Sequence, residues 1–107
     1  MYTAPPVGRL TPPVTLEATM TQKELTISNK HGLHARPAAQ FVKTSNQYRS
    51  EIWVEKDEER VNGKSIMGLM MLAAGQGSTI VVSADGQDET EALTALETLI
   101  SGGFDED

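Results

Sequence analysis

A chain of 107 residues with 38% hydrophobic residues and five aromatic side chains is long enough for one domain with one aliphatic core. It has no cysteine, which excludes disulfides and thiolate metal sites and favours a reducing, cytoplasmic compartment. All nine Lys and Arg lie in residues 1–64, whereas residues 65–107 hold eight acids and no base. This distribution excludes the clustered basic stripe of a nucleic-acid-binding protein, and no segment is apolar enough for a membrane span.

Residues 1–19 differ in composition from the rest of the chain. They contain four of the five prolines and no periodic apolar pattern, which favours extended, solvated backbone. We therefore predict a disordered leader over residues 1–19 and one domain over residues 20–107.

The patterned part of the chain opens with a predicted strand and helix. Apolar residues alternate with polar ones over 23–28 and recur at helical spacing over 35–45. Pro37 lies in the first turn of this helix, where its missing N–H costs little. Alternation then predicts a strand over 50–55, a polar turn, and a short returning strand over 60–62.

The second half of the domain contains two further helices around one strand. Ser65 is a good N-cap for a short helix over 66–72, and the apolar run within 78–84 predicts a strand. Asp88 and Glu91 have the spacing of a capping box. The helix that follows carries one apolar stripe, made of Ala92, Leu93, Leu96, Leu99 and Ile100. Two glycines then end this helix.

The predicted order of elements is β-α-β-β-α-β-α. The connections are too short for many parallel crossovers, so we expect a four-stranded antiparallel sheet with three helices covering one face. The predicted fold class is α+β, an open-faced β-sandwich.

The segment most informative about chemistry is Asn29–Ala39, which reads NKHGLHARPAA. His34 follows a glycine turn and stands at the predicted helix start, where unpaired N–H groups and partial positive charge suit an anion. Arg36 is close enough to add charge-assisted hydrogen bonds. The same positive helix end disfavours the imidazolium, which keeps a ring nitrogen nucleophilic. This chemistry needs no metal and no cofactor.

The string Gly32–Ala38 closely resembles the active-site signature of the HPr family, the phosphocarriers of the bacterial phosphotransferase system. The resemblance covers about residues 20–107 and implies that His34 is phosphorylated on Nδ1, with Arg36 as the phosphate partner. It also implies a stoichiometric carrier, not an enzyme, that accepts phosphate from enzyme I and passes it to enzyme IIA. We expect a monomer.

The string Ser65-Ile66-Met67-Gly68 resembles the serine site at which HPr kinase/phosphorylase regulates HPr proteins. An unmodified helix cap fits Ser65 equally well. The resemblance also implies an apolar docking patch around the phosphate site, made of Leu33, Ala39, Ile66, Met67 and Met70. His31 takes a position often filled by Asn in this family, so its role is open and a turn residue is the simplest interpretation.

Two other functions compete with the carrier. One is a regulatory protein read out through Ser65, like the Crh relatives, which lack the active-site histidine; the presence of His34 argues against it. The other is an unrelated acidic interaction domain in which the His-x-Arg-Pro string is a coincidence. The tail Ser101–Asp107 is similar to that of NPr, the nitrogen-related paralogue, so both a nitrogen-type and a sugar-transport output remain open.

Overall fold

A computed structural model describes residues 20–105. Its elements are β1 (Met20–Thr26), α1 (Ala35–Ser45), β2 (Glu51–Lys56), β3 (Glu59–Asn62), α2 (Ile66–Met71), β4 (Thr79–Asp85), α3 (Glu89–Ser101) and a 3₁₀ turn at Gly103–Asp105. This order confirms the predicted β-α-β-β-α-β-α arrangement. The leader predicted for residues 1–19 lies outside the described residues. No helix between residues 20 and 105 combines the length and apolar character needed to cross a membrane.

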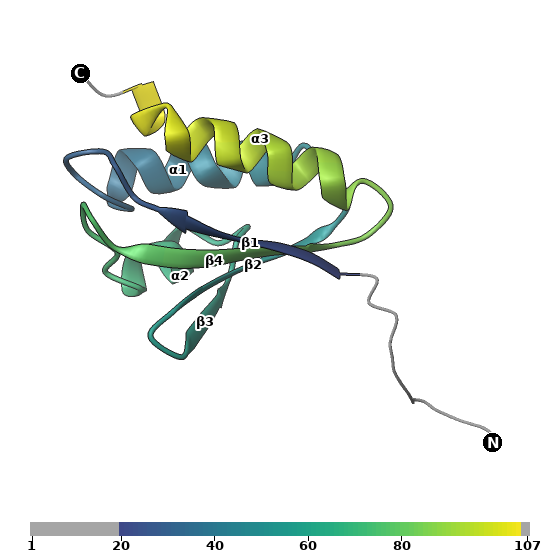
Figure 1. Ribbon diagram of the computed structural model, residues 1–107, viewed down its shortest axis with the longest axis horizontal. Coiled ribbons are helices and arrows are strands. Elements are labelled where there is room, and N and C mark those ends of the chain that lie inside the picture. Colours follow the sequence, from purple (N-terminus) through teal and green to yellow (C-terminus); the bar gives the residue numbers. More distant parts are fainter. Residues whose placement is uncertain (1–19, 106–107) are drawn as a thin grey trace.

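The four strands form one antiparallel sheet in the order β1-β4-β2-β3 (Figure 1). β4 is an inner strand and pairs with β1 along its whole length, from Met20 opposite Asp85 to Thr26 opposite Thr79. This pairing explains why β1 begins three residues before the predicted strand at 23–28: the backbone of its first three residues is held by a partner far away in the sequence.

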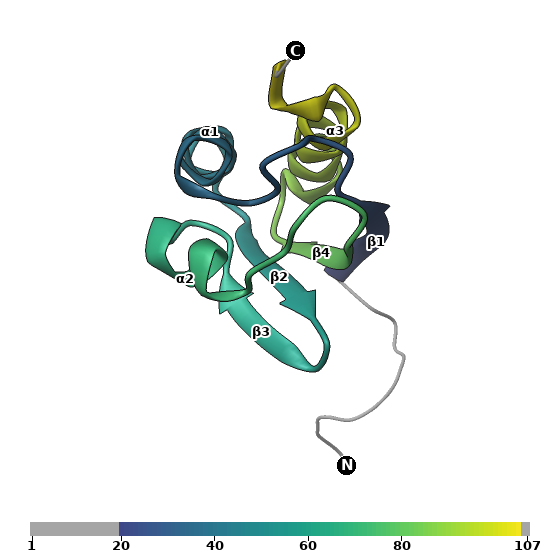
Figure 2. The ribbon, with the colours of Figure 1, turned by 90° about the vertical axis from the view of Figure 1, so that its left-hand side faces the viewer.

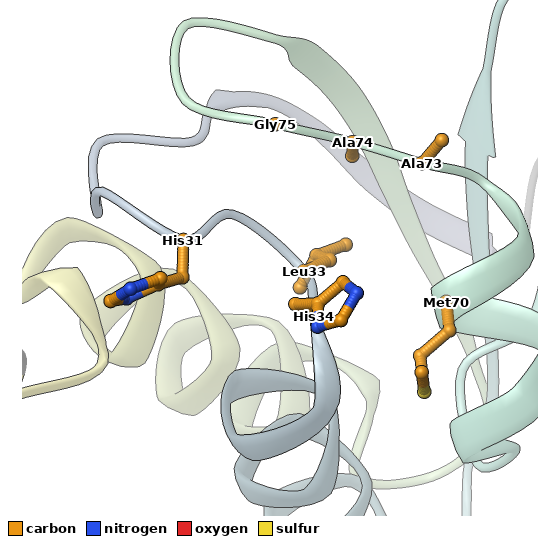
Figure 3. Close-up of a pocket in the computed structure, with 7 residues that line it drawn as sticks. All are labelled: His31, Leu33, His34, Met70, Ala73, Ala74 and Gly75. Carbon is orange, nitrogen blue, oxygen red and sulfur yellow. The ribbon is translucent and has the colours of Figure 1, made fainter.

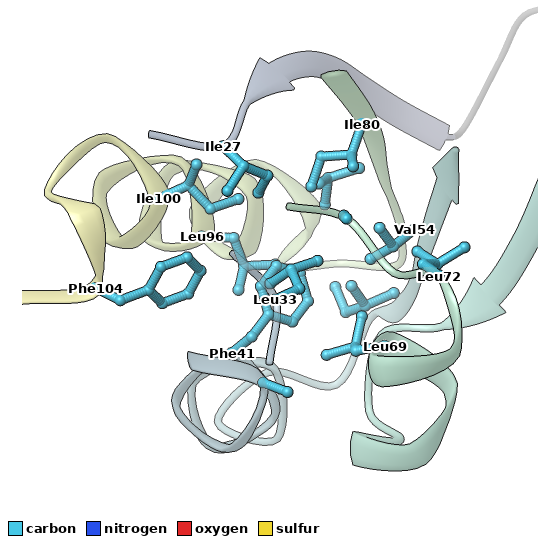
Figure 4. Close-up of a cluster of buried hydrophobic side chains, with 14 of the residues drawn as sticks. Ile27, Leu33, Phe41, Val54, Leu69, Leu72, Ile80, Leu96, Ile100 and Phe104 are labelled. Carbon is cyan, nitrogen blue, oxygen red and sulfur yellow. The ribbon is translucent and has the colours of Figure 1, made fainter. Parts of the chain in front are cut away.

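All three helices contribute to one side of the sheet, as predicted for an open-faced sandwich. α1 and α3 lie side by side above the sheet, and α2 packs against α1 and β3 (Figure 2). Their inward side chains form a single core with those of the strands (Figure 4). On β2, Ile52 and Val54 are buried in this core, whereas Trp53 is half-buried on the opposite face under the guanidinium of Arg60, 4.8 Å from the ring centroid.

The start of α3 differs from the predicted capping box. Asp88 occupies the N-cap position but makes no side-chain cap hydrogen bond. Its carboxylate instead accepts from the Ser50 hydroxyl at 2.5 Å, the Ser50 N–H at 3.0 Å and the Arg49 N–H at 2.9 Å. The Ser50 hydroxyl, followed by the Arg49 N–H, lowers the pKa of Asp88. Asp88 therefore ties α3 to the segment that enters β2.

An acid at the next position contacts the turn before α3. Glu89 accepts from the Gly86 N–H at 3.1 Å and from the Thr21 hydroxyl of β1 at 2.5 Å. The Thr21 hydroxyl is the main cause of a lowered pKa at Glu89. The capping box predicted for Asp88 and Glu91 is therefore wrong, since Glu89 reaches back in place of Glu91.

The end of α3 holds a core residue that no periodicity predicted. After the helix, Gly103 and Phe104 both take left-handed backbone conformations, with φ of 67° and 54°. This reversal returns the Phe104 ring to the core near Leu96 and Ile100, where Phe104 is only 2% exposed (Figure 4). The C-terminal turn thus closes one end of the core.

Candidate functional site

His34 stands at the N-cap of α1, as its sequence context predicts. Its backbone is extended, with φ −94° and ψ −167°, and its carbonyl accepts the N–H of Ala38 at 2.7 Å. The exposed imidazole makes no cap hydrogen bond. The helix start therefore fixes the backbone of His34 and leaves the ring available for other contacts.

The first turn of α1 offers donors next to this ring. The N–H groups of Ala35 and Arg36 have no intrahelical acceptor because they precede the first i to i−4 bond, and Pro37 has no N–H. The Arg36 side chain is exposed and forms no ion pair with a carboxylate of residues 21–104. Two amides and a guanidinium can thus receive an anion held on His34.

The loop that enters α1 is fixed to the segment between α2 and β4. The N–H of Leu33 donates to the carbonyl of Ala74 at 2.8 Å. Gly32 has a φ of +65°, and a Cβ there would lie 2.3 Å from the same carbonyl oxygen. Only glycine allows this close approach. The Asn29 side chain adds a hydrogen bond from Nδ2 to the Gly32 carbonyl at 2.9 Å.

A shallow hollow of about 230 Å³ lies between this loop and α2 (Figure 3). Its lining residues are His31, Leu33, His34, Met70, Ala73, Ala74 and Gly75. Figure 3 shows the ring of His31 turned away from that of His34, although both residues border the hollow. His34 and Met70, a methionine of the predicted docking patch, therefore line one surface depression.

The helix α2 presents apolar side chains to solvent beside the hollow. Met67 is 74% exposed and Met71 69%, whereas Leu69 on the other side of the helix is fully buried. Ile66 and Met70 are also exposed, at 41% and 36%. An apolar surface of this kind on a small protein is typical of partner binding, and methionine side chains adapt to differently shaped partners.

Two residues of the predicted docking patch behave differently from each other. Ala39 is exposed on α1. Leu33 is only 2% exposed and belongs to the core, where it packs with Phe41 and Leu69 (Figure 4). Leu33 therefore anchors the loop to the core and offers almost no surface to a partner. Its placement in the docking patch is corrected accordingly.

Ser65 is the N-cap of α2, as predicted. Its Oγ accepts the Gly68 N–H at 3.0 Å, and its backbone is extended, with φ −119° and ψ 117°. The residue is partly exposed. A hydroxyl at this position can satisfy a helix-end donor and still be reached by a modifying enzyme.

Comparison with known proteins agrees with this geometry. A family model described as the PTS HPr component phosphorylation site matches residues 21–102. The phosphocarrier protein HPr of Neisseria meningitidis serogroup A is 54% identical over 87 residues, which is 81% of this chain and 98% of the relative. The HPr-like protein Crh of Halalkalibacterium halodurans is 53% identical over 81 residues, which is 76% of this chain and 96% of the relative.

Solved structures show the same fold. HPr-C-His from Thermoanaerobacter tengcongensis superposes with a TM-score of 0.79 and 52% sequence identity, over 81% of this chain and 98% of that chain. An HPr dimer from the same organism has a TM-score of 0.66 and 55% identity, over 78% of this chain and 99% of that chain.

Proposed function

The chain belongs to the HPr family of phosphocarrier proteins, and we propose that it carries a phosphoryl group on His34 from enzyme I to an enzyme IIA. The observation that carries this proposal is the position of His34. It is an exposed N-cap residue whose ring is not used for capping, and it lies beside Arg36 and the first-turn amides that have no intrahelical acceptor.

The transfer needs only the imidazole and its surroundings. The lone pair of His34 Nδ1 forms the new N–P bond while the N–P bond to the donor histidine breaks and its electron pair returns to that ring. Both rings keep their other N–H, so the exchange requires no net proton transfer. The amides of α1 and the Arg36 guanidinium stabilise the negative charge on the transferred oxygens. The protein acts as a stoichiometric carrier with a phosphohistidine intermediate.

We further propose that the exposed side chains of α2, namely Ile66, Met67 and Met70, dock both protein partners. Ala39 is exposed on α1, the helix that packs against α2. The patch lies next to the hollow that His34 lines, so a partner seated on it brings its own histidine toward His34. Such docking turns the collision of two proteins into a positioned transfer.

Incubation with phosphoenolpyruvate and enzyme I tests the carrier function. The wild-type chain should gain one acid-labile, base-stable phosphate, and His34→Ala should gain none while its circular dichroism spectrum stays unchanged, because His34 is exposed. A folded His34→Ala protein that still gains this phosphate would refute the assignment of the site.

Regulation through Ser65 is a second proposal for the same surface. An HPr kinase/phosphorylase would add an acid-stable phosphate to Ser65, beside Ile66 and Met67. That charge must be desolvated or neutralised when a partner docks. A purely regulatory role of the Crh type is the alternative, because a Crh protein is 53% identical to this chain, although the presence of His34 argues against it. The carrier assay separates these functions, since only a carrier gains phosphate from enzyme I.

A further inference from the structure

We propose that Asn29 is a positioning residue for phosphoryl transfer, acting through the loop that aims His34. This inference rests on the proposed carrier function and concerns a residue five positions before the phosphate site. Asn29 is 4% exposed and does not line the hollow beside His34.

Asn29 holds Gly32 from two sides. Its carbonyl accepts the Gly32 N–H at 3.3 Å, and its side-chain Nδ2 donates to the Gly32 carbonyl at 2.9 Å. These two bonds fix both peptide planes around Gly32. The next N–H, that of Leu33, donates to the Ala74 carbonyl. The backbone that leads into His34 is therefore fixed at two successive residues.

The Nδ2 donor of the Asn29 side chain, and not its Oδ1 acceptor, makes the contact that holds Gly32. Among the described residues, Oδ1 of Asn29 is buried without a hydrogen-bond partner. A buried polar atom without a partner is destabilising, so Oδ1 does not account for the presence of an amide at this position. An ionised aspartate has the same shape but cannot donate, and it would place a negative charge against the Gly32 carbonyl.

The geometry of Gly32 makes it sensitive to this contact. Gly32 has a positive φ and lies close to Ala74, so its backbone can shift little without a clash. The loop forms no helix or strand whose hydrogen bonds would hold Gly32 in place of the Asn29 contact. Without the Nδ2 bond, the loop samples other orientations, and the imidazole with it. A displacement of about 1 Å in a reacting group can slow a reaction by roughly 100-fold.

The test compares two phosphoryl donors on Asn29→Asp and Asn29→Ala. Enzyme I is a protein donor that requires an aimed imidazole, whereas phosphoramidate is a small molecule that can approach the ring from any open side. We expect the turnover with enzyme I to fall about tenfold or more, with KM within about twofold. The rate with phosphoramidate should stay within about twofold of wild type, because the ring itself is unchanged.

Asn62→Asp is the matched control. Asn62 uses its Oδ1 to accept the Lys64 N–H at 2.8 Å, so an aspartate there keeps the contact, and both rates should equal wild type. Equal loss with both donors in the Asn29 variants would overturn the inference, since Asn29 would then act on ring chemistry or folding. Unchanged transfer from enzyme I would overturn it as well. A wild-type chain that takes phosphate from phosphoramidate but never from enzyme I would refute the carrier function instead.

Discussion

Replacing Phe104 by alanine tests whether the C-terminal turn belongs to the core. The side chain is 2% exposed and packs near Leu96 and Ile100, and truncating a buried Phe to Ala costs about 3–5 kcal/mol of unfolding free energy. The left-handed backbone, with φ 54° and ψ 29°, does not offset this loss, because alanine suffers the same strain. For a domain of this size the melting temperature should fall by at least about 12 °C.

Phe104→Gly isolates the backbone contribution. It removes the same ring but releases the left-handed strain, which costs a non-glycine residue about 1–2 kcal/mol. We expect Phe104→Gly to be more stable than Phe104→Ala by about 1 kcal/mol, the reverse of the usual order of these residues. Urea unfolding with an unchanged m-value measures both differences. If Phe104→Ala unfolded within about 1 kcal/mol of wild type, the turn would be a frayed end and the reasoning would be wrong.

Four further predictions concern the helix ends, the hairpin and the phosphate site. The hydrogen bonds that lower the pKa of Asp88, with the Ser50 hydroxyl first among them, stabilise the fold at pH values above the ordinary Asp pKa of 3.8. This stabilisation is lost as the pH falls through the folded-state pKa. Asp88→Asn should therefore flatten the acid side of a plot of melting temperature against pH. Glu58 turns the β2–β3 hairpin with a φ of 71°, so Glu58→Gly should raise the unfolding free energy by about 1 kcal/mol in urea titrations. Arg36→Lys should lower the turnover of His-phosphorylation more than it raises KM, because an ammonium lacks the guanidinium fork; a raised KM alone would make Arg36 a docking residue. Ser65→Asp should raise the KM for enzyme I and keep the melting temperature, because Asp also caps helices, whereas Ser65→Ala should lose about 1 kcal/mol of stability and transfer normally; wild-type kinetics in Ser65→Asp would leave Ser65 a helix cap only.

The sequence predicted those elements whose signals are local. α1 spans residues 35–45 as expected, because its apolar period and its proline in the first turn both mark the same boundaries. The cap at Ser65 was predictable for the same reason, since its acceptor lies only three residues from the donor N–H of Gly68.

Features that depend on distant partners were not predictable from one sequence. Asp88 looked like a capping residue, but its carboxylate binds Ser50, 38 positions earlier in the chain. Phe104 follows two glycines and shares no period with the apolar stripe of α3, so nothing local marked it as a core residue. The family resemblance implies a place for Leu33 in the docking patch, but its side chain is buried in the core, and alternate residues of an extended segment point to opposite sides.

The candidate site combines both kinds of information. His34 and Arg36 were identified from a short string because the anion site of a helix start is itself local. The direction of the imidazole is not local. It depends on the close contact of Gly32 with Ala74, 42 positions later in the chain, and on the buried amide of Asn29. A sequence motif can therefore point to the group proposed to carry the phosphate, whereas the residues proposed to orient this group are recognised only from the packing of the loop against the Ala74 segment.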